Sequence, residues 1–264
     1  MVNKLFKKVI NKLIYYKYKT FDYNHELILK KENSKFLSLG LDNIKAVDKL
    51  NFVLESLGLK KYNVFNDSVH WKLFSALSIL NKNDNLEILE IGTYDGNFTK
   101  ILSNLFPNAN ITTIDLPHDD PILRSSYDRK NLDAFNKYMD TQKQNIKANN
   151  ISLINTNTLF LLENLKDQKK FDIIWVDGGH LYPEIAWDIC QCFYLLKKGG
   201  YMLCDDIIKS SKDYKTQYVS TEAFRVLNYL DERHDSKNIY FLKRLDPNRL
   251  SNIYSKKYVS IIKK

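Results

Sequence analysis

The feature that most constrains the fold is a regular alternation that begins near residue 86. Short runs rich in β-branched and other apolar residues alternate with segments in which apolar residues recur at helical spacing. Strands that alternate with helices of this length form βαβ units, and consecutive units build a parallel sheet with helices on both faces. The predicted strands are Leu86–Ile91, Ile111–Leu116, Ile151–Asn155, Phe171–Val176 and Tyr201–Cys204, and the predicted helices lie near 97–105, 131–147, 159–166 and 182–196.

Strand-like runs return near the C-terminus, after a helix that is predicted near 219–232. The runs Ile239–Leu245 and Lys257–Ile262 follow each other like the arms of a hairpin, which predicts an antiparallel strand beside the parallel ones. We therefore expect an α/β protein with a Rossmann-like, doubly wound sheet of seven mostly parallel strands, in a domain at 65–264.

The first 64 residues form a predicted N-terminal helical extension to this domain. One helix is predicted over Asn43–Leu57, and the next runs from near Asp67 to Leu80. Another helix opens the chain, because the apolar residues from Val2 to Ile14 fall on one face among lysines. This basic helix would pack on its own domain, on a second subunit of a homo-oligomer, or peripherally on a membrane surface.

The charge balance is basic, since 40 Lys and Arg against 31 Asp and Glu give a formal net charge of +9. Such a charge suits an anionic partner, but much of the excess lies at the two chain ends and no aromatic-basic RNA-binding module is recognisable. We therefore do not expect nucleic acid as the main partner. The longest apolar runs fall short of the about 18 residues of a membrane-spanning helix, and the lysine-rich start argues against a secretory signal. With three cysteines that form no disulfide framework, these features predict a cytoplasmic protein.

A glycine turn between the first predicted strand and the next helix is the strongest local signal. In the segment Ile88–Thr99, Gly92 and Gly96 allow a sharp turn and the close approach of a ligand to the backbone. Ligands of open α/β sheets bind at the carboxyl ends of strands, where this turn lies. The third glycine of a dinucleotide fingerprint is absent, and no Lys-Ser/Thr pair completes a Walker loop.

Asp115 ends the second predicted strand, 19 residues after Gly96. A carboxylate at about this distance from a glycine loop can accept hydrogen bonds from both hydroxyls of a ribose. Nucleotide-binding proteins of several kinds share this device, so Asp115 favours a nucleoside-containing ligand without identifying it.

Three acidic residues are predicted to meet at the ends of the fourth and fifth strands. Asp177 follows an apolar strand, and the next strand along the chain ends at Asp205 and Asp206. Three carboxylates repel one another unless they are protonated or bound to a cation, and an all-oxygen site favours Mg²⁺. Such a metal could lower the pKa of a substrate hydroxyl. Alternatively, Asp205 or Asp206 caps the following turn and no metal binds.

His180 lies three residues after Asp177. An imidazole with an ordinary pKa near about 6.5 can take a proton from a hydroxyl group. Alternatively, His180 caps the next helix or holds the loop.

These motifs together resemble class I S-adenosylmethionine (SAM)-dependent methyltransferases. Glu90 with the Gly-x-x-x-Gly of residues 92–96 resembles their first motif. The strand-Asp-Gly-x-His-x-Tyr pattern of Asp177–Tyr182, the run Leu196–Gly200 and the Asp205-Asp206 pair resemble Mg²⁺-dependent small-molecule O-methyltransferases, which act on antibiotic sugars and catechols. The resemblance covers about residues 65–245.

The resemblance implies roles for individual residues. Glu90 would lie near the methionine end of SAM, with the backbone of Gly92, Thr93, Tyr94 and Gly96 packed against the cofactor. Asn157 and Thr158 would contact the adenine, Asp177 would lie beside the cofactor, and Asp177, Asp205 and Asp206 would hold Mg²⁺. The expected function is transfer of a methyl group from SAM to a hydroxyl of a small acceptor, such as a sugar or secondary metabolite.

Other methyl acceptors require motifs that this sequence lacks. Amide and exocyclic-amine acceptors go with an Asn/Asp-Pro-Pro-aromatic motif, whereas residues 177–180 are Asp-Gly-Gly-His, and no proline precedes a cysteine, as cytosine-C5 chemistry requires. An RNA-binding methyltransferase that uses the basic surface and a non-catalytic SAM-binding protein remain as alternatives.

Overall fold

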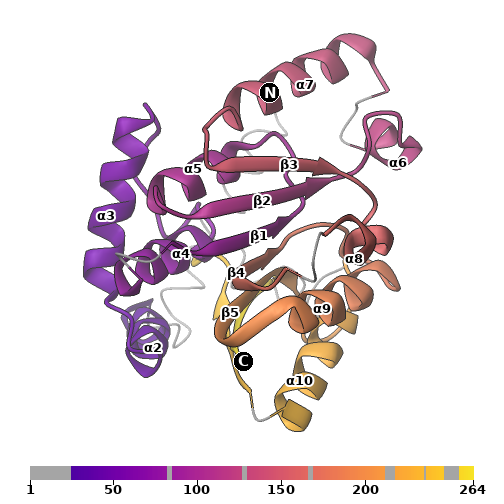
Figure 1. Cartoon of the computed structure of the whole chain (residues 1–264). Helices are drawn as coiled ribbons and strands as arrows, with labels where there is room; N and C mark the ends of the chain where they lie inside the picture. Colours follow the sequence, from indigo (N-terminus) through magenta and orange to yellow (C-terminus); the bar gives the residue numbers. More distant parts are fainter. Residues whose placement is uncertain are drawn as a thin grey trace, which may run out of the picture.

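A computed structural model describes residues 25–81, 85–126, 130–165, 169–211, 218–234, 236–246 and 256–264. The basic helix predicted from Val2 to Ile14 lies outside these ranges. Within them, a seven-stranded sheet in the order β3-β2-β1-β4-β5-β7-β6 is flanked by helices (Figure 1). The strands are β1 (Glu87–Ile91), β2 (Asn110–Asp115), β3 (Ile151–Asn155), β4 (Phe171–Val176), β5 (Leu196–Ile207), β6 (Lys237–Leu242) and β7 (Tyr258–Lys263).

The described helices are α2 (His25–Ser38), α3 (Asn43–Ser56), α4 (Val69–Leu80), α5 (Asn97–Leu105), α6 (Pro121–Ser125), α7 (Leu132–Asn145), the 3₁₀ turn η1 (Thr158–Phe160), α8 (Leu161–Asn164), α9 (Glu184–Leu195) and α10 (Glu222–His234). They include all those predicted from Asn43 onwards, whereas α2 and α6 have no predicted counterpart. None of these described helices is long and apolar enough to cross a membrane.

The strand order reverses between β1 and β4, which creates a switch point in the sheet. β1 pairs in parallel with β2 on one side and with β4 on the other, so the chain winds away from this pair in both directions. Ile91 at the end of β1 pairs with Val176 at the end of β4. Ligands of doubly wound sheets bind outside the carboxyl ends of the two strands at such a point. The fold thus places the glycine turn and Asp177 side by side.

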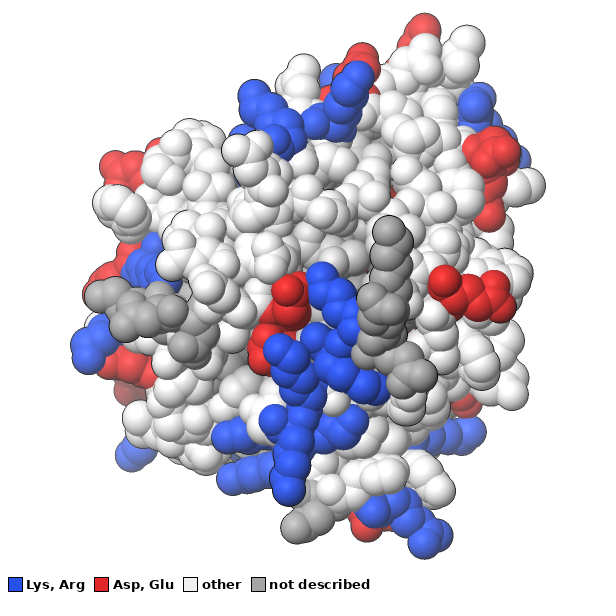
Figure 2. Space-filling view, in the orientation of Figure 1, with Lys and Arg blue, Asp and Glu red and all other residues white. Residues whose placement is uncertain are grey.

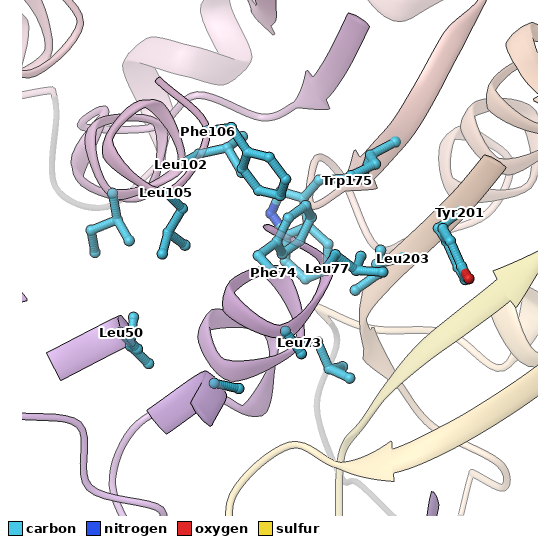
Figure 3. Packing of buried hydrophobic residues seen from close by; sticks show 14 of the residues in the cluster. Leu50, Leu73, Phe74, Leu77, Leu102, Leu105, Phe106, Trp175, Tyr201 and Leu203 are labelled. Atoms are coloured by element: carbon cyan, nitrogen blue, oxygen red, sulfur yellow. The ribbon is translucent and has the colours of Figure 1, made fainter. Parts of the chain in front are cut away.

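The sheet is buried on both faces because apolar side chains point alternately up and down along its strands. In β4, Ile173 and Trp175 pack on the face covered by the N-terminal helices and α5, whereas Ile174 and Val176 pack with α9 and α10 on the other face. Figure 3 shows the first of these two cores, with Trp175 beside side chains from α4 and α5. This three-layer arrangement confirms the predicted doubly wound fold.

The helices α2 and α3 share the first core rather than standing apart from it. Leu50 of α3 and Phe36 of α2 are fully buried, and the Phe36 ring lies 4.9 Å from the ring of Phe241 in β6. α3 begins where the Asp42 carboxylate accepts hydrogen bonds from the backbone N–H groups of residues 44 and 45. These contacts join residues that the sequence assigns to the extension at 1–64 with the sheet of the domain at 65–264, and the boundary between the two stays a prediction.

Two details near the C-terminus differ from expectation. The run Leu196–Gly200 lies outside the predicted strand Tyr201–Cys204, yet β5 begins at Leu196, directly after α9 ends at Leu195. Gly199 has a φ of +83°, and the pairing of β4 with β5 shifts register there, so the two glycines form a strand irregularity. The predicted hairpin of β6 and β7 is present, but β7 inserts between β5 and β6, antiparallel to both.

Candidate active site at the carboxyl ends of β1 and β4

Gly92 lets the ends of β1 and β4 approach each other at the switch point. Its φ is +95°, and a Cβ atom there would lie 2.3 Å from the carbonyl oxygen of Asp177. The backbone N–H of Gly92 donates to the carbonyl of Ile114 at the end of β2, and the N–H of Asp177 donates to that of Ile91, each at 2.8 Å. Only glycine fits this position. Through these backbone contacts the turn joins the ends of β1, β2 and β4.

The rest of the turn leads into α5 through two further left-handed residues. Tyr94 has a φ of 50° and Gly96 one of 73°, and Gly96 caps α5. A non-glycine residue in this region of backbone space is uncommon, and such residues collect at functional sites. The predicted turn Gly92–Gly96, including Thr93, is therefore present, and its contact with SAM stays a prediction.

Glu90 lies beneath the turn and is buried. One of its carboxylate oxygens, Oε2, accepts hydrogen bonds from the hydroxyls of Thr99 in α5 and Thr113 in β2, both at 2.6 Å. Burial raises the pKa of Glu90 to about 8, although the two threonine hydroxyls oppose the shift. Glu90 thus connects β1 to its neighbours from inside the core, and its predicted contact with SAM stays a prediction.

Two side chains of α7 donate hydrogen bonds to Asp115 at the end of β2. Its Oδ2 accepts hydrogen bonds from the hydroxyl of Tyr138 at 3.2 Å and from the amide of Gln142 at 3.1 Å. The same amide of Gln142 donates to the carbonyl of Tyr94 at 2.6 Å. Gln142 therefore connects the predicted ribose carboxylate to the glycine turn. No motif in the sequence marks this glutamine.

The predicted adenine contacts lie after β3, over α9. Asn157 caps η1 by accepting a hydrogen bond from the N–H of Leu159 at 3.0 Å, and the carbonyl of Thr158 accepts one from the Gln191 amide at 2.9 Å. Beneath them lies Asp188, which is buried and whose pKa is raised to about 6 by that burial, against a hydrogen bond with Thr158. Asp188 escaped sequence analysis because it sits within a helix pattern that has no motif.

Asp177 and His180 meet at the end of β4. The His180 Nε2 atom lies 3.5 Å from Asp177 Oδ1 and 3.9 Å from Asp206 Oδ2. About a third of the Asp177 side chain (31%) is exposed, against 18% for His180. The carbonyl of His180 accepts a hydrogen bond from the N–H of Ser220 at 2.9 Å, which holds the loop. Asp177 and His180 therefore lie close to Asp206 at the end of the fifth strand, as the sequence predicts for Asp177.

The charges in this cluster shift the titration of both groups. Burial and, next, the negative charge of Asp205 raise the pKa of Asp177 to about 7. Burial alone lowers the pKa of His180, but the carboxylates of Asp177, Asp206 and Asp205 outweigh it and raise that pKa overall. The cluster thus places a carboxylate with a pKa near neutrality at the switch point, beside an imidazole whose pKa is raised by its acidic neighbours.

Two lysines complete the cluster, and sequence analysis did not anticipate them. The ammonium of Lys243, just after β6, lies 2.5 Å from Asp205 Oδ2 and 2.5 Å from Asp206 Oδ1. The ammonium of Lys257, just before β7, lies 2.5 Å from Asp206 Oδ2. Although burial opposes ionisation, Lys243 holds the pKa values of both aspartates below their ordinary range. Asp206 also has a φ of 52°, the second left-handed non-glycine residue of the site.

These ion pairs do not fit the predicted Mg²⁺ site. Mg²⁺ takes about six oxygen ligands at about 2.0–2.1 Å, whereas Asp205 Oδ2 and both oxygens of Asp206 are bonded to ammonium groups. Among the described residues, no group of three or more His, Cys, Asp or Glu side chains is arranged to hold a metal ion. The three carboxylates converge as predicted, but lysines relieve their repulsion, and the structure does not support Mg²⁺ at Asp177, Asp205 and Asp206.

Basic side chains gather on the face of the molecule that Figure 2 shows. In Figure 2, Lys and Arg side chains concentrate in the lower middle of the face, over the region where Figure 1 places β5 and the C-terminal end. Lys197 and Lys198 in β5 and Lys263 in β7 lie at the opposite ends of their strands from Asp206 and Lys257. These three lysines are therefore separate from the candidate active site.

Comparisons with known proteins agree with this geometry. Residues 89–207 match a family model described as a methyltransferase domain. An uncharacterised protein of Acanthamoeba polyphaga mimivirus is 26% identical over 153 residues, which make up 55% of this chain and 63% of that relative. The chain thus spans less than two thirds of that relative's length.

Solved structures share the fold. The chain is similar to a candidate caffeoyl-CoA O-methyltransferase from Staphylococcus aureus, with a TM-score of 0.51 and 15% identity over 92% of this chain and 100% of that chain. It is also similar to a candidate O-methyltransferase from Klebsiella pneumoniae, with a TM-score of 0.48 and 14% identity over 88% of this chain and 95% of that chain. At such identities, the Staphylococcus likeness is evidence for the fold alone, and it agrees with the predicted class of sheet.

Proposed function

We propose that this chain is a SAM-dependent O-methyltransferase of a small hydroxylated molecule, because residues 89–207 match the model of a methyltransferase domain. The observation that carries this proposal is the partly exposed Asp177 carboxylate, paired with His180 directly beside the glycine turn at the switch point. A carboxylate that titrates near neutrality in this place suits the removal of a proton from a hydroxyl group.

The residues along the carboxyl edge of the sheet fit SAM. The turn Gly92–Gly96 offers bare backbone at the end of β1, and Asp115 offers a carboxylate for ribose hydroxyls at the end of β2. Asn157 and Thr158 lie at the end of β3, where the adenine would be held. When bound, SAM supplies an electrophilic methyl group on a sulfonium, which leaves as a neutral thioether after transfer.

Within the pair, we assign the proton-accepting role to Asp177 and a positioning role to His180. The Nε2 of His180 faces two carboxylates, which favours the proton on that nitrogen, while its Nδ1 is buried without a hydrogen-bond partner. The acceptor's hydroxyl proton passes to an oxygen of Asp177, and the acceptor oxygen uses the freed electron pair to form its bond to the methyl carbon. His180 holds Asp177 in place and stabilises its ionised form. We route no step through Mg²⁺, because the oxygens that would bind it are paired with lysines.

The proposal also covers the acceptor, the cellular location and the partners of the protein. A sugar or a secondary metabolite would suit the site as acceptor. We also propose a cytoplasmic location, and a second subunit or a membrane surface as the partner of the basic helix that the sequence predicts from Val2 to Ile14. No observation in the described residues favours the RNA-binding or the non-catalytic alternative over the small-molecule enzyme.

An acceptor screen tests the proposed function. Radiolabelled SAM is incubated with the protein and panels of hydroxylated sugars, phenols and lipids, with EDTA or with Mg²⁺. We expect label to pass to at least one acceptor, and Asp177→Asn to lower kcat by a factor of about 10² to 10⁴. Matched transfer by wild type and Asp177→Asn, or transfer to RNA alone, would contradict the proposal.

A further inference from the structure

The pairing of Lys243 with Lys257 is built into the register of the β6–β7 hairpin. Leu242 pairs with Tyr258, and the N–H of Lys243 donates to the carbonyl of Lys257 at 2.9 Å, so the two lysines face each other at the next position. Like charges directly across a sheet destabilise it. This pair is tolerable because Asp206 contacts both ammonium groups, one with each carboxylate oxygen, at 2.5 Å.

Burial makes the ion pairs obligatory for the cluster. Only 11% of the Lys243 side chain, 4% of that of Asp205 and 14% of that of Asp206 are exposed. A buried charge is retained only when an opposite charge and hydrogen bonds replace its water. The ammonium groups of Lys243 and Lys257 supply this opposite charge to Asp205 and Asp206.

A divalent cation would have to displace both ammonium groups to reach these oxygens. Apart from the oxygens already bonded to lysine, the cluster offers Asp205 Oδ1, which is buried without a partner, and the carboxylate of Asp177. Mg²⁺ can keep waters in its remaining positions, but a cation on this set would lack the carboxylate of Asp206 and would lie next to the ammonium groups that hold it. Displacement would also leave the ammonium groups of Lys243 and Lys257 facing each other, because the metal would compete for the Asp206 carboxylate between them.

We propose that Lys243 and Lys257 take the charge-balancing place of a divalent cation, so that methyl transfer in this chain needs no metal. Lys243 is then a positioning residue: it fixes Asp205 and Asp206, and Asp206 in turn faces His180, which holds Asp177. The positioning role rests on the proposed function, whereas the absence of a metal site does not.

Titration with Mn²⁺ alone tests the metal-free cluster without SAM or acceptor. Mn²⁺ is a hard, paramagnetic stand-in for Mg²⁺, and its binding to the full chain is followed by electron paramagnetic resonance after EDTA treatment and desalting. We expect wild type to bind Mn²⁺ more weakly than about 1 mM. We expect Lys243→Met and Lys257→Met, which leave carboxylates unpaired, to bind it at least about tenfold more tightly. Lys197→Met is the matched control, because Lys197 pairs with Asp172 at 2.8 Å outside the cluster, and it should behave as wild type.

Each outcome decides the matter. Wild-type binding tighter than about 1 mM, or equal affinity in wild type and both cluster variants, would overturn the metal-free cluster. If the lysine variants fail to fold, wild type alone still decides, because a thermal midpoint that rises with added Mn²⁺ would reveal a metal site. With an acceptor in hand, wild-type kcat should survive EDTA, and Lys243→Arg should recover much of the kcat that Lys243→Met loses, with the KM for SAM unchanged. Loss of activity in EDTA would overturn the proposal even where the acceptor screen succeeds.

Discussion

At the scale of single residues, the site depends on positions where a side chain is excluded as much as on positions where one is required. Gly92 is the clearest case, because its missing Cβ leaves room for the carbonyl of Asp177. Any larger residue there must push β1 and β4 apart at the point where cofactor and acceptor are proposed to meet.

Gly92→Ala should therefore destabilise the protein by more than about 2 kcal/mol, because it adds a backbone clash to the strain of a left-handed alanine. Gly58→Ala is the matched control: Gly58 also has a positive φ, of +70°, but nothing lies within 4 Å of the added Cβ. The control should lose only about 1–2 kcal/mol in urea unfolding. Equal losses in the two variants would show that the contact with Asp177 does not constrain the turn.

The buried carboxyl of Glu90 predicts a pH dependence of stability. Its pKa is raised from 4.5 to about 8 in the folded chain, so folding keeps a proton that the unfolded chain releases. This contribution is complete below pH about 4.5 and is lost as pH rises to about 8, with a slope of at most about 1.4 kcal/mol per pH unit. Glu90→Gln keeps both threonine hydrogen bonds and should be more stable than wild type at pH about 8. Urea unfolding across this range checks it, and parallel curves for the two proteins would refute the buried neutral carboxyl.

Asp177, His180 and the glycine turn could be predicted from sequence because each follows an apolar strand at a recognisable spacing. Lys243 and Lys257 could not. Lysine is frequent throughout this chain, and no local pattern separates a buried, paired lysine from a solvated one. Only the register of β6 with β7 brings these two onto Asp206.

At the scale of elements, α7 covers the edge of the sheet where we propose that SAM binds. Gln142 reaches from this helix to Asp115 and to the carbonyl of Tyr94, and the Tyr138 ring lies 5.7 Å from that of Tyr94. The ribose carboxylate and the glycine turn are thus oriented by one helix.

Gln142→Leu should weaken SAM binding by about tenfold, because Asp115 and the turn lose a shared donor worth about 1–1.5 kcal/mol. Gln144→Leu is the matched control, since it is the same change at an exposed position of the same helix. Calorimetric titration with SAM measures both variants. Unchanged affinity in Gln142→Leu would remove α7 from the proposed cofactor site.

The sequence predicts β1 to β4 well because these strands are short apolar runs with clear ends. It fails at residues 196–200, where a glycine pair can stop a helix or interrupt a strand. The choice depends on Gly200, which packs against the carbonyl of Asp172 in the neighbouring strand, and such a contact leaves no local signature. The insertion of β7 between β5 and β6 is likewise a long-range choice.

At the scale of the whole molecule, the N-terminal helices and the sheet share one core. Leu50 of α3 is fully buried in the same cluster as Leu102 of α5 and Trp175 of β4 (Figure 3). We therefore expect the described part of the chain to unfold as one cooperative unit.

Leu50→Ala should lower the free energy of unfolding by about 2–5 kcal/mol and keep a single transition, because a cavity in a shared core weakens every element around it. Phe52→Ala is the matched control on the same helix, since Phe52 is 74% exposed, and it should change stability by less than about 0.5 kcal/mol. Circular dichroism and tryptophan fluorescence followed together would detect two separate transitions, which would instead favour an independent extension at residues 1–64.

SAM binding is the most direct test of the whole interpretation, because the glycine turn, Asp115 and α7 are all proposed to surround that ligand. Isothermal titration of the metal-free protein with SAM, in EDTA, should show one site per chain with a Kd in the range of about 1 μM to 1 mM. Asp115→Ala should abolish or strongly weaken that binding, whereas Lys197→Met should leave it intact. If the metal-free wild-type protein takes up no SAM, or if Asp115→Ala binds as tightly as wild type, the proposed cofactor site is wrong.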